Sequence, residues 1–301
     1  METLYDRISV NKRSTYLLVF LFTCIIGFLG YMFGLYMGSP YVGLAVALTI
    51  AVALSLFSYF EGASAILELS GARLAKKENF SYLINTVEGL SIAAGIPAPK
   101  VYVIDEDSIN AFATGRDPEH ASIAVTTGAL KKLNRSELEG VIAHEISHIK
   151  NYDIRLMMIV VILVGVAALL SDMILRTFIY GKGRRNAHEN RGGVFFVVLL
   201  TAGLILAVLS PIIAQIIKFA ISRRREYLAD ADGALLTRHP KALANALRKI
   251  KNDNDRIVDS ANKVTAHLWI ENPLRKYEGV INRMFSTHPP IEERIKILES
   301  M

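Results

Sequence analysis

The sequence predicts a multi-pass α-helical membrane protein with an α+β domain outside the membrane. Its 301 residues are 52% hydrophobic with a mean hydropathy of +0.33, and the apolar residues gather in long runs. About 20 apolar residues are enough for a helix to cross the hydrocarbon core of a bilayer. Between the runs lie two polar regions that combine helical spacing with short β-branched segments, which indicates an α+β domain.

The first apolar region covers residues 14–60, which contain no Asp, Glu, Lys or Arg. This length accommodates two spanning helices, joined by a turn at Gly38, Ser39 and Pro40. Basic residues precede the run, as they do in a signal peptide, but the run is too long for the apolar core of a signal peptide. The sequence therefore predicts a retained transmembrane hairpin within residues 1–60.

A second apolar region lies between the two polar regions. Residues 156–171 and 192–217 carry no charge, and we expect them to form a second transmembrane hairpin within residues 154–221. The later run is long enough to span unaided, whereas the earlier run is short. The loop between them is basic from Lys182 to Arg191, which leaves open whether this hairpin crosses fully.

These apolar runs divide the chain into four regions, at residues 1–60, 61–153, 154–221 and 222–301. Because the first hairpin returns to its starting side, both polar regions share one compartment with the N-terminus. Basic residues flank the apolar runs, and the positive-inside tendency assigns that compartment to the cytoplasm. We therefore expect a protein of the cell membrane (the inner or plasma membrane) with a cytoplasmic domain.

The net charge of +6 and the isoelectric point of about 9.3 raise the question of a nucleic-acid partner. The basic residues cluster at the ends of apolar runs, however, as Arg223, Arg224 and Arg225 do. Anionic lipid is the simpler partner for basic residues in these places. Binding to nucleic acid is not expected.

Helices and strands alternate in the first polar region. Residues 81–94 have helical spacing, and Gly95 is expected to end this helix. Residues 100–104 and 121–126 are β-branched runs between turn residues, and they are expected to be strands.

The second polar region is expected to be helical. Residues 226–237 and 240–250 have helical spacing, and residues 252–262 read as a polar loop. A final helix follows Pro289 and Pro290. Its expected inward-facing residues are Ile291, Ile295 and Leu298.

A pair of histidines indicates a metal site. Ser136 and Glu139 form a capping-box pattern that predicts a helix starting near Ser136, and this helix carries His144, Glu145 and His148. Histidines four residues apart lie on one helical face, so their rings can converge on one ion. Glu145 is rotated off that face and can reach a water molecule beside the ion. The spacing is the H-E-x-x-H pattern of zinc peptidases.

The plainer alternative is a surface helix with two histidines and a solvated glutamate. The neighbours Val141, Ile142 and Ile146 are apolar, which favours a buried metal-binding helix. The chain has a single cysteine, Cys24, inside the first apolar run, so its zinc ligands must be His, Glu or Asp.

The third ligand is expected on a second helix. A catalytic zinc ion takes three protein ligands and keeps one position for water. The metzincin pattern needs Gly and His shortly after the second histidine, but Asn151 and Ile154 occupy those positions. A glutamate followed one turn later by an aspartate is the other solution, and Glu226 and Asp230 supply it.

Position along the chain supports Glu226. If the second apolar region forms an antiparallel hairpin, His148 and Glu226 both stand roughly 8–9 Å above the apolar layer, at 1.5 Å rise per residue. Asp230 then faces the same way as Glu226. It can accept a hydrogen bond from a ligand imidazole, although an ordinary surface carboxylate fits its spacing equally well.

Taken together, these segments resemble the HtpX-type membrane zinc metalloproteases, which are relatives of the prenyl-protein (CAAX) proteases. The resemblance covers nearly the whole chain and includes residues 110–115, 226–230 and 288–294 besides the H-E-x-x-H motif and both apolar regions. It implies a gluzincin-like zincin domain on the cytoplasmic face with one Zn²⁺ per chain. It also implies cleavage of misfolded or damaged membrane proteins under stress.

The resemblance assigns roles to individual residues. By motif, the zinc ligands are His144, His148 and Glu226, and Glu145 is the general base. Regions 61–153 and 222–301 then contribute the two parts of one catalytic domain.

Further residues are implied near the substrate. A segment similar to the family's substrate-pairing edge strand comprises Asn110, Ala111, Phe112 and Ala113; such pairing uses main-chain hydrogen bonds and allows a loose sequence preference. His288 and Arg294 are similar to family residues that help to stabilise the tetrahedral oxyanion. A helix-start turn before the two prolines explains His288 equally well.

Two other functions remain open. One is a narrow-specificity processing protease of the prenyl-protease type, although such relatives usually have more membrane spans. The other is a membrane scaffold or sensor with a structural zinc, which would not need Glu145 as a base. The sequence does not determine the native substrates or the oligomeric state.

Overall fold

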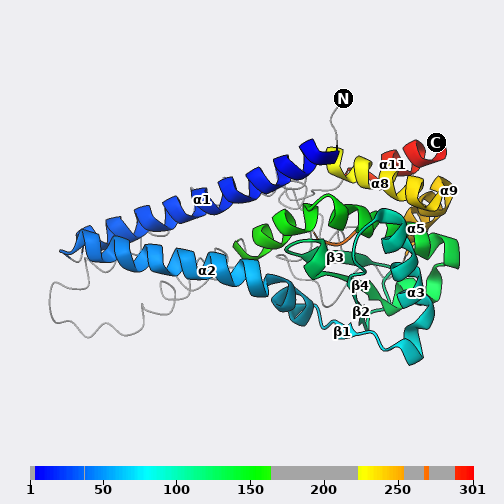
Figure 1. Cartoon of the computed structure of the whole chain (residues 1–301), viewed down its shortest axis with the longest axis horizontal. Coiled ribbons are helices and arrows are strands. Elements are labelled where there is room, and N and C mark those ends of the chain that lie inside the picture. The colour runs from blue at the N-terminus through cyan, green and yellow to red at the C-terminus, as the bar shows by residue number, and fades with distance from the viewer. Residues whose placement is uncertain (1–3, 37, 164–222, 254–267, 271–288) are drawn as a thin grey trace.

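The computed structural model of the chain describes residues 4–36, 38–163, 223–253, 268–270 and 289–301. In this part of the chain, two long helices extend from a domain in which helices surround a four-stranded sheet (Figure 1). The expectations for the basic loop at 182–191, for the rest of the second apolar region beyond residue 163, for the loop at 254–262 and for His288 concern residues outside the described part.

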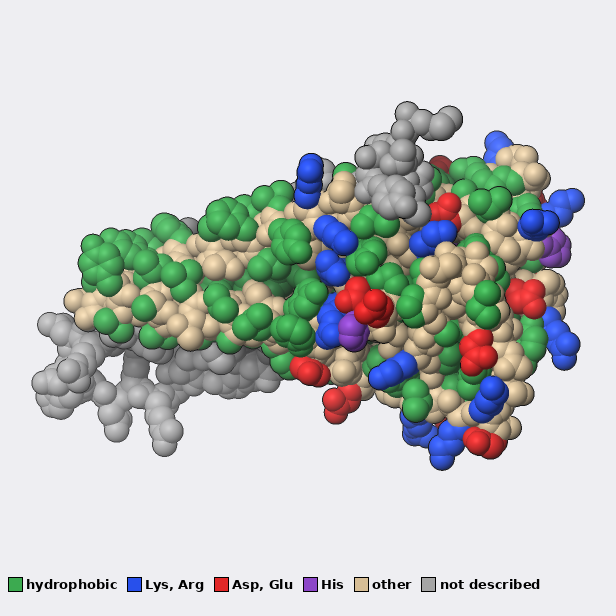
Figure 2. Space-filling model, viewed as in Figure 1, with side chains coloured by type: hydrophobic (Ala, Val, Ile, Leu, Met, Phe, Trp, Pro, Cys, Tyr) green, Lys and Arg blue, Asp and Glu red, His purple; other side chains and the backbone are tan. Residues whose placement is uncertain are grey.

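The long helices are α1 (Leu4–Tyr36) and α2 (Pro40–Leu69), which lie side by side. As predicted, Gly38 and Ser39 form the turn between them, and Gly38 has a φ of +79°. Both helices extend beyond the charge-free run at its outer ends. Residues Ile8–Met32 of α1 and the whole of α2 are long and apolar enough to cross a membrane. Hydrophobic side chains cover this pair, while charged side chains gather on the domain (Figure 2).

The sheet contains β1 (Arg73–Leu74), β2 (Lys100–Ile104), β3 (Ala111–Gly115) and β4 (Ala121–Thr126). The spatial order is β1-β2-β4-β3, with β2 parallel to β4 and β3 antiparallel to β4. The strand predictions at 100–104 and 121–126 are therefore confirmed. The strand β3 is at the edge of the sheet and begins one residue after Asn110.

Helices cover the sheet and complete the domain. Gly95 ends α3 with a left-handed φ of +71°, as its position predicts. The helices expected around 81–94, 226–237 and 240–250 all exist, with ends that differ by a few residues. The described helices of the domain are α3 (Lys77–Ala94), α4 (Thr127–Lys132), α5 (Arg135–Lys150), α8 (Arg223–Thr237), α9 (Pro240–Asn252) and α11 (Ile291–Glu299). A short 3₁₀ turn, η1 (Pro118–His120), precedes β4.

The predicted capping box of α5 is wrong by two residues. Asn134, not Ser136, is the N-cap: its Oδ1 accepts the Glu137 N–H at 2.9 Å, and Glu137 Oε2 accepts the Asn134 N–H at 2.8 Å. Glu139 instead accepts a hydrogen bond from Tyr82 in α3. Asn134-x-x-Glu137 satisfies the same pairing rule, and an asparagine caps a helix as well as a serine does.

The helix α5 is the centre of the domain, and two glycines allow its neighbours to approach closely. A Cβ at Gly140 would lie 2.9 Å from the backbone nitrogen of Leu243 in α9. A Cβ at Gly233 in α8 would lie 3.0 Å from the backbone nitrogen of His144. Glycine at these two positions therefore sets the spacing of the three helices.

We predict that Gly233→Val destabilises the protein, because the added side chain collides with the backbone of α5. Overpacking of this kind costs about 1–3 kcal/mol. The matched control is Gly89→Val in α3, where a Cβ would meet open space. Thermal unfolding of the full chain in detergent should show a lower melting temperature for Gly233→Val only. Equal melting temperatures would contradict the close-packing role of Gly233.

Candidate active site

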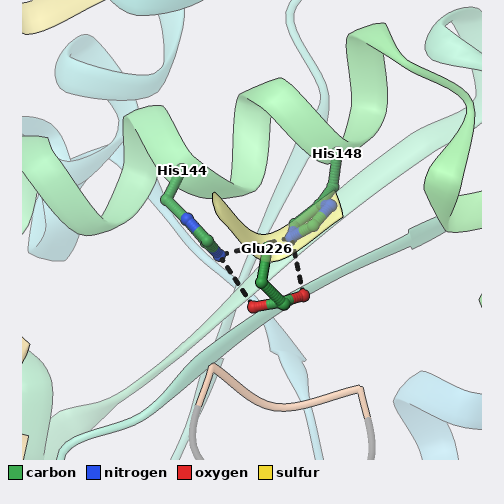
Figure 3. Close-up of side chains that lie close together, drawn as sticks. All are labelled: His144, His148 and Glu226. Carbon is green, nitrogen blue, oxygen red and sulfur yellow. Dashed lines mark hydrogen bonds and ion pairs between the residues drawn. The ribbon is translucent and has the colours of Figure 1, made fainter. Parts of the chain in front are cut away.

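Three of the predicted site residues come together between α5 and α8. His144 and His148 are one turn apart on α5, and Glu226 is in the first turn of α8 (Figure 3). The two Nε2 atoms are 3.2 Å apart, and the carboxylate oxygens of Glu226 lie 3.7 Å from His144 Nε2 and 3.5 Å from His148 Nε2. All three side chains are buried.

This geometry fits a single metal ion. Tetrahedral coordination with bonds of about 2.0–2.2 Å separates the ligand atoms by about 3.3–3.6 Å, which is close to the observed separations. Two imidazole nitrogens and one carboxylate are a donor set that a divalent transition metal prefers. Without a cation, the two Nε2 atoms and the carboxylate would face one another in a buried space, where unpaired polar groups are costly.

Asp230 holds the first histidine. Its Oδ1 lies 3.0 Å from His144 Nδ1. The other ring nitrogen, Nε2, faces His148 and Glu226. Burial would raise the pKa of Asp230, but the Arg294 guanidinium outweighs that effect and lowers the pKa to about 2. Asp230 is therefore ionised at neutral pH, and its charge favours the tautomer of His144 that has its proton on Nδ1 and leaves Nε2 available.

Asp153 holds the second histidine in the same way, and sequence reasoning missed it. Its Oδ2 lies 3.0 Å from His148 Nδ1. Five residues along a regular helix would not bring Asp153 back to His148. However, α5 ends at Lys150, and Tyr152 adopts a left-handed φ of +61° that turns the chain back. An acidic residue just after the motif was the only available signal.

The surroundings of His148 favour its protonated form when no metal is bound. Burial alone would lower the pKa of His148, but Asp153 and Glu226 together raise it to about 9. A metal ion must displace this proton, because only the neutral imidazole nitrogen coordinates.

Glu145 faces the edge strand beside the cluster. It is buried, and burial raises its pKa above the usual range, although the two histidines oppose this shift. The backbone of Ala113 in β3 also donates a hydrogen bond to the Glu145 carboxylate. A carboxylate with a raised pKa is a stronger base. The position of Glu145 next to the His144, His148 and Glu226 side chains suits proton transfer.

The outer side of β3 is partly occupied. The Thr126 N–H donates a hydrogen bond to Asn110 O, so the peptide groups of Asn110 face β4. Every second residue of an antiparallel strand faces the same way, so the peptide groups of Phe112 and Thr114 also face β4. Those of Ala111, Ala113 and Gly115 alternate with them and face away from the sheet.

A segment that sequence reasoning did not single out lies along this edge. Ile270 N donates a hydrogen bond to Ala111 O at 3.1 Å. The neighbouring Trp269 is fully buried, and its ring meets the Phe112 ring edge to face at a centroid distance of 4.8 Å. Residues 268–270 therefore cover the first residues of β3. The part of the β3 edge that lies beside Glu145 comes after them and begins at Ala113.

Arg294 is fully buried behind the ligands. It forms a two-pronged ion pair with Asp230, with distances of 2.7 and 2.8 Å, and donates to Ile270 O at 3.2 Å. One of its nitrogens also lies 3.5 Å from Glu226. These contacts make Arg294 a partner of Asp230 and Glu226. Its expected action on an oxyanion stays a prediction.

The fold and the site define a metallopeptidase: a buried glutamate, Glu145, lies between a His-His-Glu cluster and the edge strand of a mixed sheet. Comparison with known sequences agrees. The model of peptidase family M48 matches residues 77–301, and the chain belongs to this family.

Close relatives extend over the whole chain. It is 46% identical over 299 residues to a protein named "Protease HtpX homolog" from Dictyoglomus turgidum, which covers 99% of this chain and 95% of the relative. It is 47% identical over 303 residues to the protein of the same name from Caldanaerobacter subterraneus, covering 100% and 98% of the two chains. The chain is therefore a membrane metalloprotease of family M48, with α1 and α2 as its candidate spans.

A solved structure shares the fold. The crystal structure of S. mikatae Ste24p matches with a TM-score of 0.52 and 18% identity. The match covers 97% of this chain but 66% of Ste24p, so the present chain spans about two thirds of that longer protein. At this identity, the likeness concerns the fold alone.

We predict that Arg294→Met strongly destabilises the protein, because Asp230 would stay buried without its partner. Breaking a buried ion pair on one side costs about 3–5 kcal/mol. The control is Lys131→Met, which breaks the exposed pair between Lys131 and Asp107 and should change stability little. Thermal unfolding in detergent measures both. A melting temperature of Arg294→Met equal to that of Lys131→Met would contradict this role.

We also predict that metal affinity rises with pH up to about pH 9. The pKa of His148 is raised to about 9 in the metal-free protein, so below that pH a metal ion competes with a proton on the ring. Titration of the metal-free protein with Zn²⁺ at several pH values measures this trend. The opposite sign, or an affinity that levels off near pH 6.5, would show that His148 is not protonated as described.

Proposed function

We propose that the protein is a zinc endopeptidase of the cell membrane that cleaves misfolded or damaged membrane proteins on the cytoplasmic side. The observation that carries this proposal is the position of Glu145, which is next to the His144, His148 and Glu226 cluster and faces an edge strand. A purely structural metal site has no use for a base in that place.

The proposed zinc ligands are His144, His148 and Glu226, with one Zn²⁺ per chain. A zinc ion held there supplies a Lewis acid that lowers the pKa of a water molecule and polarises a peptide carbonyl. Glu145 takes the proton of the attacking water and delivers it to the leaving amine. Asp230 and Asp153 keep the two imidazole rings oriented throughout.

The substrate is proposed to bind as an extended strand along β3. The outward-facing carbonyl of Ala113 and the peptide groups of Gly115 lie beyond the point where Ile270 pairs with Ala111. Pairing there brings the substrate backbone next to Glu145, which contacts Ala113. Main-chain pairing reads little of the substrate sequence, which suits an enzyme for damaged proteins.

The membrane arrangement supports substrates in or near the bilayer. We propose four spanning segments, with α1 and α2 as the first hairpin and residues 154–221 as the second. Regions 61–153 and 222–301 then form one gluzincin-like catalytic domain, which the basic flanks of the apolar runs assign to the cytoplasm. The domain adjoins one end of the α1 and α2 pair (Figure 1).

The test is Glu145→Gln in the purified full chain in detergent, with casein as an unfolded substrate and zinc content measured by mass spectrometry. We expect one zinc per chain in both proteins and a loss of cleavage of about 100- to 10,000-fold in the variant, the usual contribution of a general base. The control is Glu139→Gln on the same helix, whose partner is the Tyr82 hydroxyl.

Three outcomes would contradict the proposal. Equal cleavage by the wild type and Glu145→Gln would remove Glu145 from the chemistry. Bound zinc without cleavage of casein or of detergent-solubilised membrane proteins by the wild type would favour the scaffold function. Cleavage confined to prenylated peptides would favour a narrow processing protease.

A further inference from the structure

The helix α1 contacts the surroundings of the candidate metal site through Asn11. It lies near the start of α1, far from the turn to α2, and is only 5% exposed. Asn11 Nδ2 donates to the backbone oxygen of Asn151 at 2.8 Å and to Asp153 Oδ1 at 2.7 Å. Asn151 is the C-cap of α5, and Asp153, the carboxylate that faces His148, begins the helical residues that follow the turn.

The same amide also contacts α8. Asn11 Oδ1 accepts a hydrogen bond from Arg225 Nη1 at 2.9 Å, and Arg225 directly precedes Glu226. That nitrogen of Arg225 lies 3.5 Å from Asp153 Oδ1 as well. One side chain of α1 therefore joins the segments that carry His148 and Glu226, and Figure 1 shows this end of α1 beside α8.

A neighbouring contact strengthens this junction. The ammonium group of Lys12 lies 4.4 Å from the centre of the Tyr152 ring. Tyr152 is the residue with the left-handed backbone that returns the chain toward His148. Two successive residues of α1 thus contact the turn that places Asp153.

The chemistry of the site requires an amide at position 11. Asp153 is an anion that needs a donor, and Arg225 is a cation that needs an acceptor, and asparagine offers both within one short side chain. An aspartate would direct an oxygen at the Asp153 carboxylate. An alanine would remove the amide donor that lies 2.7 Å from the buried Asp153 Oδ1, and a lost partner of this kind is costly.

We propose that Asn11 is a positioning residue of the metal centre. It fixes one oxygen of Asp153, so that the other oxygen stays against His148 Nδ1 and the Nε2 of that ring faces the ion. The inference rests on the proposed zinc site. It gives α1 a role besides membrane insertion, although Asn11 lies outside residues 77–301, which the family model matches.

The experiment measures zinc affinity of the full chain in detergent, by competition with a chromophoric chelator. Substitution of groups that orient a metal ligand typically weakens binding about 10- to 100-fold, and we expect Asn11→Ala to fall in this range. The matched control is Thr15→Val, one turn further along α1. Thr15 is equally buried, and its hydroxyl bonds to the backbone oxygen of Asn11. The control should bind zinc like the wild type.

A double-mutant cycle with Asp153→Asn separates positioning from general damage. If Asn11 acts through Asp153, adding Asn11→Ala to Asp153→Asn weakens zinc binding by much less than it does in the wild type. Asn11→Asp keeps the size of the side chain and should also lose affinity, which protects the test if Asn11→Ala does not fold. At saturating zinc, KM should be unchanged, because Asn11 is not placed against the substrate strand.

Wild-type affinity in Asn11→Ala, an equal loss in Thr15→Val, or fully additive losses in the cycle would each overturn the proposal. Failure of the proposed function gives a different result. In that case the wild type itself binds no zinc, or binds zinc without cleaving casein, before any variant is compared.

Discussion

The rest of the domain depends on a concentration of negative charge around one point in its interior. Four buried carboxylates surround His144 and His148: Glu145, Asp153, Glu226 and Asp230. The guanidinium groups of Arg294 and Arg225 oppose them. With all four carboxylates ionised, two formal negative charges remain, which one divalent cation balances. Hydrogen-bond donors to Asp153, Asp230 and Glu145 help to make the burial of this charge tolerable.

This constraint explains why so many segments meet at α5. The proposed ligands come from α5 and α8, and the groups that orient them come from residues just after α5, from α8, from α11 and, in our inference, from α1. Close packing at Gly140 and Gly233 holds α9 and α8 against α5, so small displacements would change the distances between ligands. The candidate membrane helix α1 and the domain are thereby joined by contacts close to His148 and Glu226. In our inference, removing α1 would also remove the Asn11 contacts to Asp153 and Arg225.

Local features were predicted well because short-range rules decide them. The strands at 100–104 and 121–126, the end of α3 at Gly95 and the turn at Gly38 follow from β-branching and from backbone freedom at glycine. The capping box was misplaced because two overlapping sequences satisfy the same rule, and only the hydrogen bonds distinguish Asn134 from Ser136. Asp153 was missed because the left-handed residue Tyr152 breaks the helical period on which the prediction relied.

The sequence by itself determined the apolar runs, the order of the elements and the convergence of His144 with His148, since four residues of helix place them on one face. It also indicated Glu226 through the spacing of a second motif. Only the tertiary structure decided which distant groups complete the site. Asn11, Arg225 and Ile270 reach it through contacts between elements far apart in the chain, and the ion pair of Arg294 with Asp230 likewise joins distant helices. Such contacts depend on how the helices pack, which no local pattern of residues encodes.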